Sequence, residues 1–193
     1  MSYVGTGEQA MSMNISSSYI MRNVYQGYSD LKDEAGRKHA TKHELVDADR
    51  RAMVRALDRI GDLDYEDTDR TNTKNIYNML TSYIDVYNHA VTSAGDSDSN
   101  DIKRTAAKMK NFTKEYADEL EELGITIKSD GSLKVDKKEL KSATTKAVKK
   151  IFSGDSDYVS GMKKLMKKLR NHVNREPEND FGMEDQSSLN LLV

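Results

Sequence analysis

The sequence predicts a mainly α-helical fold, an antiparallel helical bundle that carries one small β-hairpin at about residues 125–135. Three observations support this fold class. Apolar residues recur at helical spacing along most of the chain. Strand-like alternation is concentrated in "LGITIKSDGSLKVDKKEL", residues 123–140. The chain has a single proline, Pro177, so no proline interrupts a helix before that position.

Composition limits the class of protein. The chain has 193 residues, of which 36% are apolar and 32% are charged, and this balance suits a lean core with a highly solvated surface. The absence of cysteine excludes disulfides, thiolate metal sites and a cysteine nucleophile. No run of about 18 apolar residues occurs, so we expect no membrane span. The first residues also lack the basic start and the apolar run of a secretory signal.

We expect three regions along the chain. Residues 1–18 are rich in Ser, Gly, Met and Asn without periodicity and are expected to be a disordered N-terminal segment. Residues 19–174 are expected to form the helical domain with its hairpin, and residues 175–193 an acidic flexible tail. Charge is segregated, because residues 137–175 hold twelve Lys or Arg against three acids, a net charge of +9. Residues 176–193 hold five acids and no base.

Apolar stripes predict the helices of the domain. The expected ranges are 19–35, 43–60, 72–93, 101–123, 137–152 and 156–173. Gly61 is placed to end the second of these helices as a left-handed C-terminal cap. The helices at 72–93 and 101–123 are joined by a short loop, so we expect them to form an antiparallel helical hairpin.

The Asp-Gly turn within residues 123–140 has two interpretations, a calcium loop and a β-hairpin. A calcium loop with Gly131 at its sixth position would place Lys128 and Lys137 at two of the ligand positions. Lysine repels the ion, so we interpret the stretch as a hairpin that fastens the helices together.

The alternation of the two arms predicts the register of this hairpin. A three-residue loop ending at Gly131 pairs Ile127 with Leu133 and Ile125 with Val135, which puts all four apolar side chains on one face. With Gly131 at the turn and Asp136 after the second arm, these four residues form the predicted hairpin clasp. We expect the four aliphatic side chains of the clasp to press against the helices, because an isolated two-stranded hairpin is marginal in water.

Both flanks of the hairpin carry helix-capping residues. Gly124 is placed to cap the helix that precedes the hairpin. Asp136 and Glu139 are placed to form a capping box for the helix that follows it.

Two stretches resemble a known family. The pattern "YADELEELGITIKSDGSLKVDKKELKSATTKAVKKIF", residues 116–152, resembles the C-terminal region of the flagellar filament cap protein, in the hook-associated protein family. There, a helix that ends in a Leu-Gly-Ile turn leads to a short hairpin, a further helix and an apolar Phe. The stretch "SYIDVYNHAVTSA", residues 82–94, is similar to the helix of that family that carries a Tyr-Asn pair. Together the resemblance covers about residues 76–152.

The resemblance implies a non-enzymatic structural protein of the bacterial flagellum. Such a protein would act by self-association or by binding axial proteins, and would be exported to the flagellum or the cell exterior without a cleavable signal. The chain departs from the family because it is too short for the large inserted domains and lacks sustained terminal heptads. We therefore expect a reduced, flagellum-associated relative that retains the helical domain.

The basic stretch "GMKKLMKKLRNHVNR", residues 161–175, supports a different class of function. Its cations suit nucleic acid, an anionic lipid surface or a calmodulin-like protein partner. They are Lys163, Lys164, Lys167, Lys168 and Arg170. Its Met and Leu residues at core spacing equally fit a surface helix of a bundle. The alternative is thus a cytoplasmic helical adaptor or regulator that binds an anionic partner through its basic C-terminal helices.

No residue pattern predicts catalysis. His39 and His43 lie four residues apart, but Asp47 stands where a metalloprotease motif requires its second histidine. Ser, His and Asp residues form no credible triad, and the glycines form no phosphate-binding loop. We expect no enzyme activity, no metal site and no cofactor.

Overall fold

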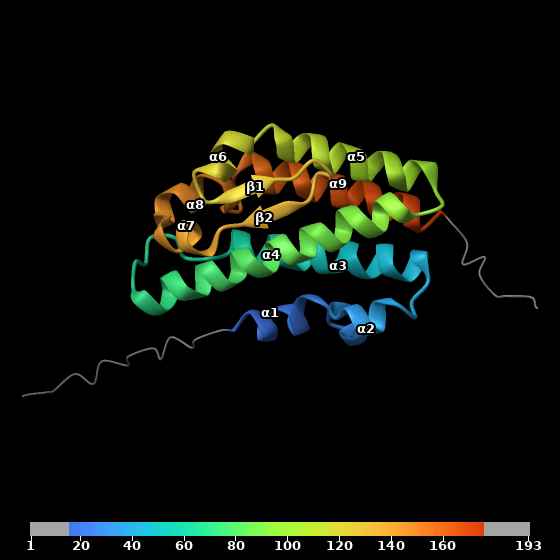
Figure 1. Cartoon of the computed structure of the whole chain (residues 1–193), viewed down its shortest axis with the longest axis horizontal. Helices are drawn as coiled ribbons and strands as arrows, with labels where there is room; N and C mark the ends of the chain where they lie inside the picture. Colours follow the sequence, from blue (N-terminus) through green and yellow to red (C-terminus); the bar gives the residue numbers. More distant parts are fainter. Residues whose placement is uncertain (1–15, 176–193) are drawn as a thin grey trace, which may run out of the picture.

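The structure is a computed structural model that describes residues 16–175, and over this range the chain is mainly helical with one two-stranded antiparallel hairpin (Figure 1). The first elements are α1 (Ser17–Val24), the 3-10 helix η1 (Ser29–Lys32), α2 (Glu34–Arg37), α3 (Lys42–Gly61) and α4 (Arg70–Asp96). They are followed by α5 (Asn100–Lys114), α6 (Ala117–Glu121), β1 (Ile125–Ile127), β2 (Leu133–Val135), α7 (Lys137–Ser142), α8 (Thr145–Phe152) and α9 (Asp157–Val173).

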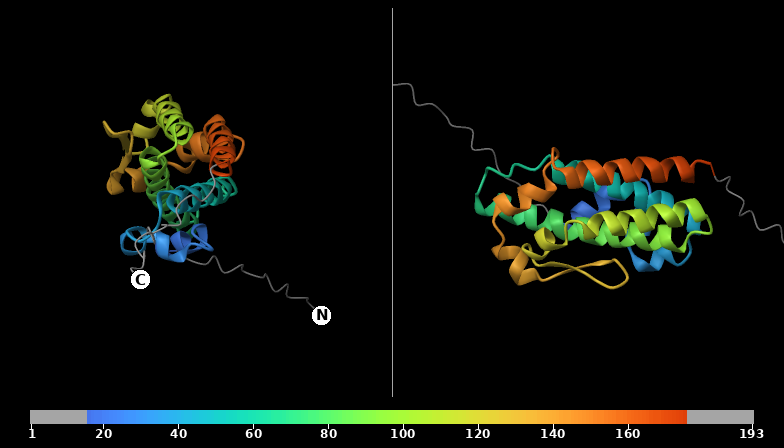
Figure 2. Two further views of the ribbon diagram at one scale, coloured as in Figure 1. Left: turned by 90° about the vertical axis from the view of Figure 1, so that its right-hand side faces the viewer. Right: turned by 90° about the horizontal axis from the view of Figure 1, so that it is seen from above.

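Helices α3, α4, α5 and α9 form a bundle in which each helix runs antiparallel to its neighbours (Figure 1). The side-chain contacts show the direction of α9. Asp101 at the start of α5 meets His172 at the end of α9, and Asp58 near the end of α3 meets Lys163 near the start of α9. The end-on view in Figure 2 places α1 and α2 on one side of α4 and the β-hairpin with α7 on another. The long helices therefore share one core, and the short elements cover part of its outside.

Aromatic side chains fill the end of the core where α8 joins α9. The hydroxyls of Tyr83 and Tyr158 lie 2.8 Å apart, and both side chains are fully buried. The ring of Phe152 packs edge-on against both, and the Phe112 ring stacks on Tyr158. A buried tyrosine needs a partner for its hydroxyl, and here each of the two supplies it for the other.

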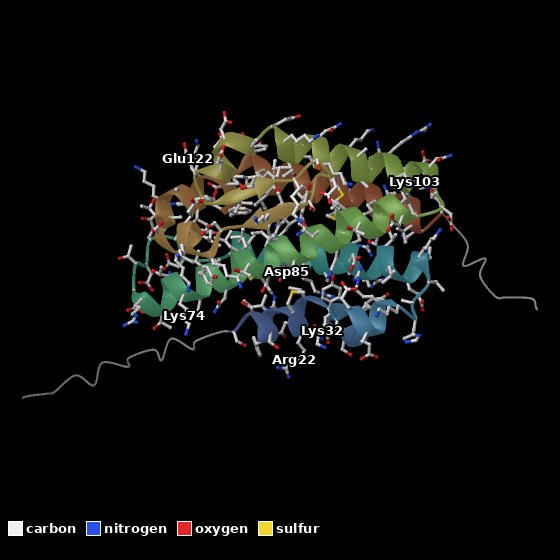
Figure 3. All side chains as sticks on the ribbon, viewed as in Figure 1. Arg22, Lys32, Lys74, Asp85, Lys103 and Glu122 are labelled. Atoms are coloured by element: carbon white, nitrogen blue, oxygen red, sulfur yellow. The ribbon has the colours of Figure 1, made fainter. Side chains whose placement is uncertain are left out.

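Three of the predicted helices match the structure closely. The structure contains α3, α4 and α9 where the stripes predict helices at 43–60, 72–93 and 156–173, and α4 extends further at both ends. Thr41 caps α3 in a reciprocal capping box with Glu44, whose carboxylate accepts the Thr41 amide at 2.8 Å. The predicted antiparallel pairing of α4 with α5 is also present. Charged side chains such as Arg22, Lys103 and Glu122 point away from the bundle (Figure 3).

The prediction of one helix over 19–35 is wrong. The chain forms α1, η1 and α2 instead, with a turn around Gly27. Gly27 has φ +87°, a left-handed conformation that a glycine adopts at no steric cost and that a right-handed helix does not contain. The predicted disorder of residues 1–18 is wrong for its last residues, because Ser16 caps α1 and Ser17 begins it. Residues 1–15 lie outside the described residues, as do residues 176–193 of the predicted acidic tail.

Two further helices are shorter than predicted. The range 101–123 is divided into α5 and α6, and nothing in the local sequence predicts the interruption. The range 137–152 is divided into α7 and α8 for a visible reason. Ala143 is extended, and the hydroxyl of Thr144 accepts a hydrogen bond from the Ala147 amide at 3.2 Å. This side chain starts a new helix, since threonine competes well for exposed backbone amides at a helix N-terminus.

Gly61 does not act as the predicted left-handed cap. Within residues 16–175, positive φ occurs only at Gly27, Gly124 and Gly131. Gly61 is the last residue of α3, and its carbonyl accepts a hydrogen bond from the Gly154 amide at 3.1 Å. A Cβ atom on Gly61 would lie 2.9 Å from the Gly154 Cα, so this glycine allows the turn between α8 and α9 to approach the end of α3.

Candidate functional site

The hairpin has the register that the sequence predicts. Ile125 pairs with Val135 and Ile127 with Leu133, so this prediction is confirmed. The Lys128 carbonyl accepts the Gly131 amide at 2.9 Å, and the Lys128 amide donates to the Ser132 carbonyl at 2.8 Å. With φ +82° at Gly131, this is the three-residue loop built from a type I turn and a glycine bulge.

All four aliphatic residues of the hairpin clasp lie against the hydrophobic core. Ile125 and Leu133 are buried, at 0% and 2% exposure, whereas Ile127 and Val135 are half-buried and pack against the core from its edge. Each cross-strand pair thus contains one buried and one half-buried residue. Full burial of a large aliphatic side chain contributes about 1.5–3 kcal/mol, so Ile125 and Leu133 contribute most to holding the hairpin.

Helix α4 fastens the hairpin through two adjacent residues that sequence reasoning did not single out as contacts. The Asn88 amide group donates to the Leu133 carbonyl at 2.9 Å and accepts from the Leu133 amide at 2.7 Å. The Tyr87 hydroxyl donates to the Gly131 carbonyl at 3.3 Å. Asn88 therefore occupies the place that a neighbouring strand would take beside β2. The signal in the sequence was the Tyr-Asn pair itself, which carries part of the family resemblance.

The flanks of the hairpin form only part of the predicted caps. Gly124 has φ +72° and closes the turn after α6, as predicted. The Asp136 carboxylate caps α7 by accepting the amides of Lys138 and Glu139, which lowers the pKa of Asp136. The reciprocal half of the capping box is absent, because the Asp136 amide donates to the Gly124 carbonyl at 2.7 Å. The closing hydrogen bond of the hairpin therefore replaces the predicted contact with the Glu139 side chain.

The five cations proposed on α9 do not form one uniform face. Lys163 faces α3 and pairs with Asp58 at 2.7 Å, so part of its charge is compensated. Lys168 lies on the side that meets α5, beside Lys108. The remaining three, Lys164, Lys167 and Arg170, are exposed.

The tertiary structure adds a second basic helix that the sequence reading did not include. Helix α5 carries five bases and one acid, and α9 carries the same balance, so the adjacent pair holds a net charge of +8. The ammonium of Lys168 lowers the pKa of Lys108, because two like charges meet where the helices touch. Arg104 lies near the same point. We call Arg104, Lys108 and Lys168 the basic seam. In the sequence, the feature that indicated this basic helix was the run of cations within residues 100–114.

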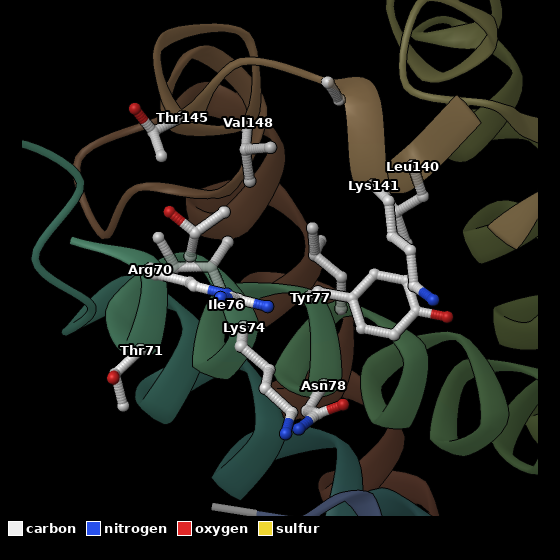
Figure 4. A pocket seen from close by; sticks show the side chains of 13 residues that line it. Arg70, Thr71, Lys74, Ile76, Tyr77, Asn78, Leu140, Lys141, Thr145 and Val148 are labelled. Atoms are coloured by element: carbon white, nitrogen blue, oxygen red, sulfur yellow. The ribbon is translucent and has the colours of Figure 1, made fainter. Parts of the chain in front are cut away.

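A groove of about 660 Å³ lies between the first half of α4 and the pair α7 and α8 (Figure 4). Its apolar lining consists of Ile76, Tyr77, Leu80, Leu140, Ala143 and Val148. Its cations are Arg70, Lys74 and Lys141, and its hydroxyl and amide groups come from Thr71, Thr73, Asn78 and Thr145. The break between α7 and α8 opens this space, since Ala143 stands at the break.

A buried polar cluster fixes α1 and α2 to the bundle. The carboxylate of Asp49, which is fully buried, accepts two hydrogen bonds from Arg37 at 2.7 Å and one from the Tyr25 hydroxyl at 2.8 Å. The Tyr25 hydroxyl also lies 2.9 Å from Nδ1 of His89. Burial, followed by the charge of Arg37, lowers the pKa of His89. Each group here has a partner within the protein, so the cluster is a structural tie between segments.

The histidine spacing noted in the sequence has no counterpart as a ligand pair. His39 lies in the turn after α2, whereas His43 lies in the first turn of α3 with Nε2 3.3 Å from the Val173 carbonyl. In residues 16–175, no three His, Cys, Asp or Glu side chains gather as metal ligands do. No helix of this range is long and apolar enough to cross a membrane.

Comparison with known proteins assigns no relative. No family model matches the chain, and no curated protein or solved structure is significantly similar to it.

Proposed function

We propose that this chain is a non-enzymatic structural protein associated with the bacterial flagellum, related to the filament cap through residues 76–152. One observation supports the proposal most directly. The two stretches that resemble the family, residues 82–94 and 116–152, lie together in the fold, because Asn88 of the first holds Leu133 of the second. Contact between the two resembling segments supports the proposal more than either segment alone, because it shows that they belong to one structural unit.

Such a protein would act through surfaces and not through a reactive centre. Its mode of action would be self-association or the binding of flagellar axial proteins. Its location would be the flagellum or the cell exterior after export without a cleavable signal. The exposed flank of the hairpin, opposite the four aliphatic residues of the clasp, is one surface that such a partner can reach.

Co-sedimentation tests the proposal. The purified chain would be mixed with reconstituted flagellar filaments, with and without the hook-associated proteins, and the filaments pelleted. We expect the chain to pellet with filaments or with the axial components, in an amount that saturates. A chain that stays in the supernatant at every ratio, and that remains monomeric at high concentration, would contradict the proposal.

The basic seam supports a second candidate, a cytoplasmic helical adaptor or regulator that binds an anionic partner. The ammonium groups of Lys108 and Lys168 meet where α5 and α9 touch, and a bound anion would relieve their repulsion. Retention on heparin or on vesicles with anionic lipid would fall as salt rises. Replacing Lys108 and Lys168 by Glu should abolish retention if the seam binds, whereas the pair Lys103→Glu and Lys110→Glu on other sides of α5 serves as the control.

A further inference from the structure

The groove between α4 and α7–α8 combines an apolar floor with an uncompensated positive rim. Four of its aliphatic residues are buried to 4% exposure or less. They are Ile76, Leu80, Leu140 and Val148. These side chains belong to the core and form the base of the groove, which opens to solvent. A concave site of this volume with an apolar lining and a few polar groups has the general character of a ligand site.

Positive charge comes from both walls of the groove. Arg70 and Lys74 lie one turn apart on α4, and Lys141 extends from α7 with its ammonium 5.2 Å from the centre of the Tyr77 ring (Figure 4). Within residues 16–175, none of the three cations forms a salt bridge, and the groove lining contains no Asp or Glu. The site is therefore complementary to negative charge.

The placement of the three cations favours a peptide over a single lipid. Arg70 and Lys74 lie on α4, and Lys141 lies on α7 at the other wall of the groove. A fatty acid carries one carboxylate, whereas an acidic peptide carries several along its length and can meet all three cations. The Thr73 hydroxyl already donates to the Asp69 carbonyl at 3.0 Å, so it needs no partner from a ligand.

We propose that this groove binds an acidic peptide segment of a protein partner, with aliphatic side chains on the floor and carboxylates at Arg70, Lys74 and Lys141. The aliphatic side chains would supply the apolar contact. The carboxylates would supply orientation and the rate of association, since charged groups at the edge of an interface act mainly in this way. The groove would bind this ligand whether or not the chain associates with flagella, because the basic seam and the exposed flank of the hairpin lie on other elements.

Fluorescence anisotropy tests the proposal with a defined probe. The probe is a labelled synthetic peptide with the sequence of residues 176–193, which carries five acids, no base and the apolar stretch "LNLLV". The receptor is the full chain at about 50 mM salt. We expect saturable binding, and a loss of about tenfold or more in affinity when Lys74→Glu and Lys141→Glu are combined. Both side chains are exposed, so the variant should fold.

A matched control separates the groove from general charge. Arg22→Glu with Lys38→Glu makes the same change in net charge at exposed positions of α1 and of the turn after α2, and should leave the affinity within about twofold. Equal weakening by both pairs would overturn the proposal, as would equal binding of a probe in which every acid is replaced by its amide.

Two further experiments test other ligands for the groove. Vesicles of phosphatidylcholine with phosphatidylglycerol should not bind through the groove. Vesicle binding that the groove pair abolishes, with no binding of the peptide, would assign the site to lipid and overturn the proposal. A full chain with amides in place of its own five acids beyond residue 175 should bind the probe as the native chain does. If only that variant bound the probe, the groove would be assigned to the chain's own acidic segment, and a separate protein partner would be excluded.

Discussion

Replacing Asn88 by alanine should loosen the hairpin and destabilise the whole fold. The side chain makes two hydrogen bonds to one residue of β2, at 2.9 Å to the Leu133 carbonyl and 2.7 Å from the Leu133 amide. Each such bond contributes about 1 kcal/mol net, and a buried partner left unpaired costs about 1–3 kcal/mol. Asn88 is half-buried, so water can reach part of the vacated space. The expected loss is therefore about 2–3 kcal/mol, out of a total stability that is typically about 5–15 kcal/mol.

Two measurements on Asn88→Ala test this expectation. Urea denaturation reports the loss in free energy of unfolding, which corresponds to about a 30- to 140-fold change in the unfolding equilibrium. Hydrogen exchange should show a faster rate at the Leu133 amide, because that amide loses its acceptor. Asn88→Asp should be no more stable than Asn88→Ala. A carboxylate keeps the acceptor for the Leu133 amide but turns its second oxygen toward the Leu133 carbonyl, where the native amide group donates.

Asn111→Ala is the matched control, because Asn111 is exposed on α5 and should change stability by less than about 0.5 kcal/mol. This expectation would be refuted if Asn88→Ala lowered the free energy of unfolding by less than about 0.5 kcal/mol and the Leu133 amide exchanged at its native rate. Asn88 would then not fasten the hairpin.

Three further predictions concern other parts of the fold. Gly131→Ala should cost about 1–2 kcal/mol, because φ +82° is strained for alanine, and an unchanged denaturation midpoint would contradict this. Arg37→Met should cost about 3–5 kcal/mol by leaving the buried Asp49 carboxylate unpaired, and adding Asp49→Leu should restore much of the loss in the same denaturation assay. His89 has a lowered pKa, so below its ordinary value of 6.5 the unfolded chain binds more protons than the folded chain. Stability should therefore fall as pH drops from 6.5 toward the folded pKa, and His89→Gln should flatten this part of the profile; an identical profile would refute the role of His89.

Local chemistry in the sequence was sufficient to predict the hairpin almost completely. Its register follows from the alternation of Ile125, Ile127, Leu133 and Val135, and its loop follows from the need for glycine at Gly131. These features depend on residues that are close in the chain, where pattern and backbone conformation are directly linked. The same reasoning failed where two local preferences compete, as at Thr144, whose hydroxyl starts α8 inside a stripe that alone predicts one helix.

The sequence by itself therefore determined the helical class, the long helices and the hairpin. Only the tertiary structure decided which of these elements meet. It brought α5 beside α9 and so created the basic seam, placed Asn88 against β2, and opened the groove where α7 and α8 leave α4 incompletely covered. The physical reason is that an apolar stripe determines which face of a helix is buried, but not which other face covers it. That choice depends on packing among residues distant in the chain, where many stripes are equally apolar.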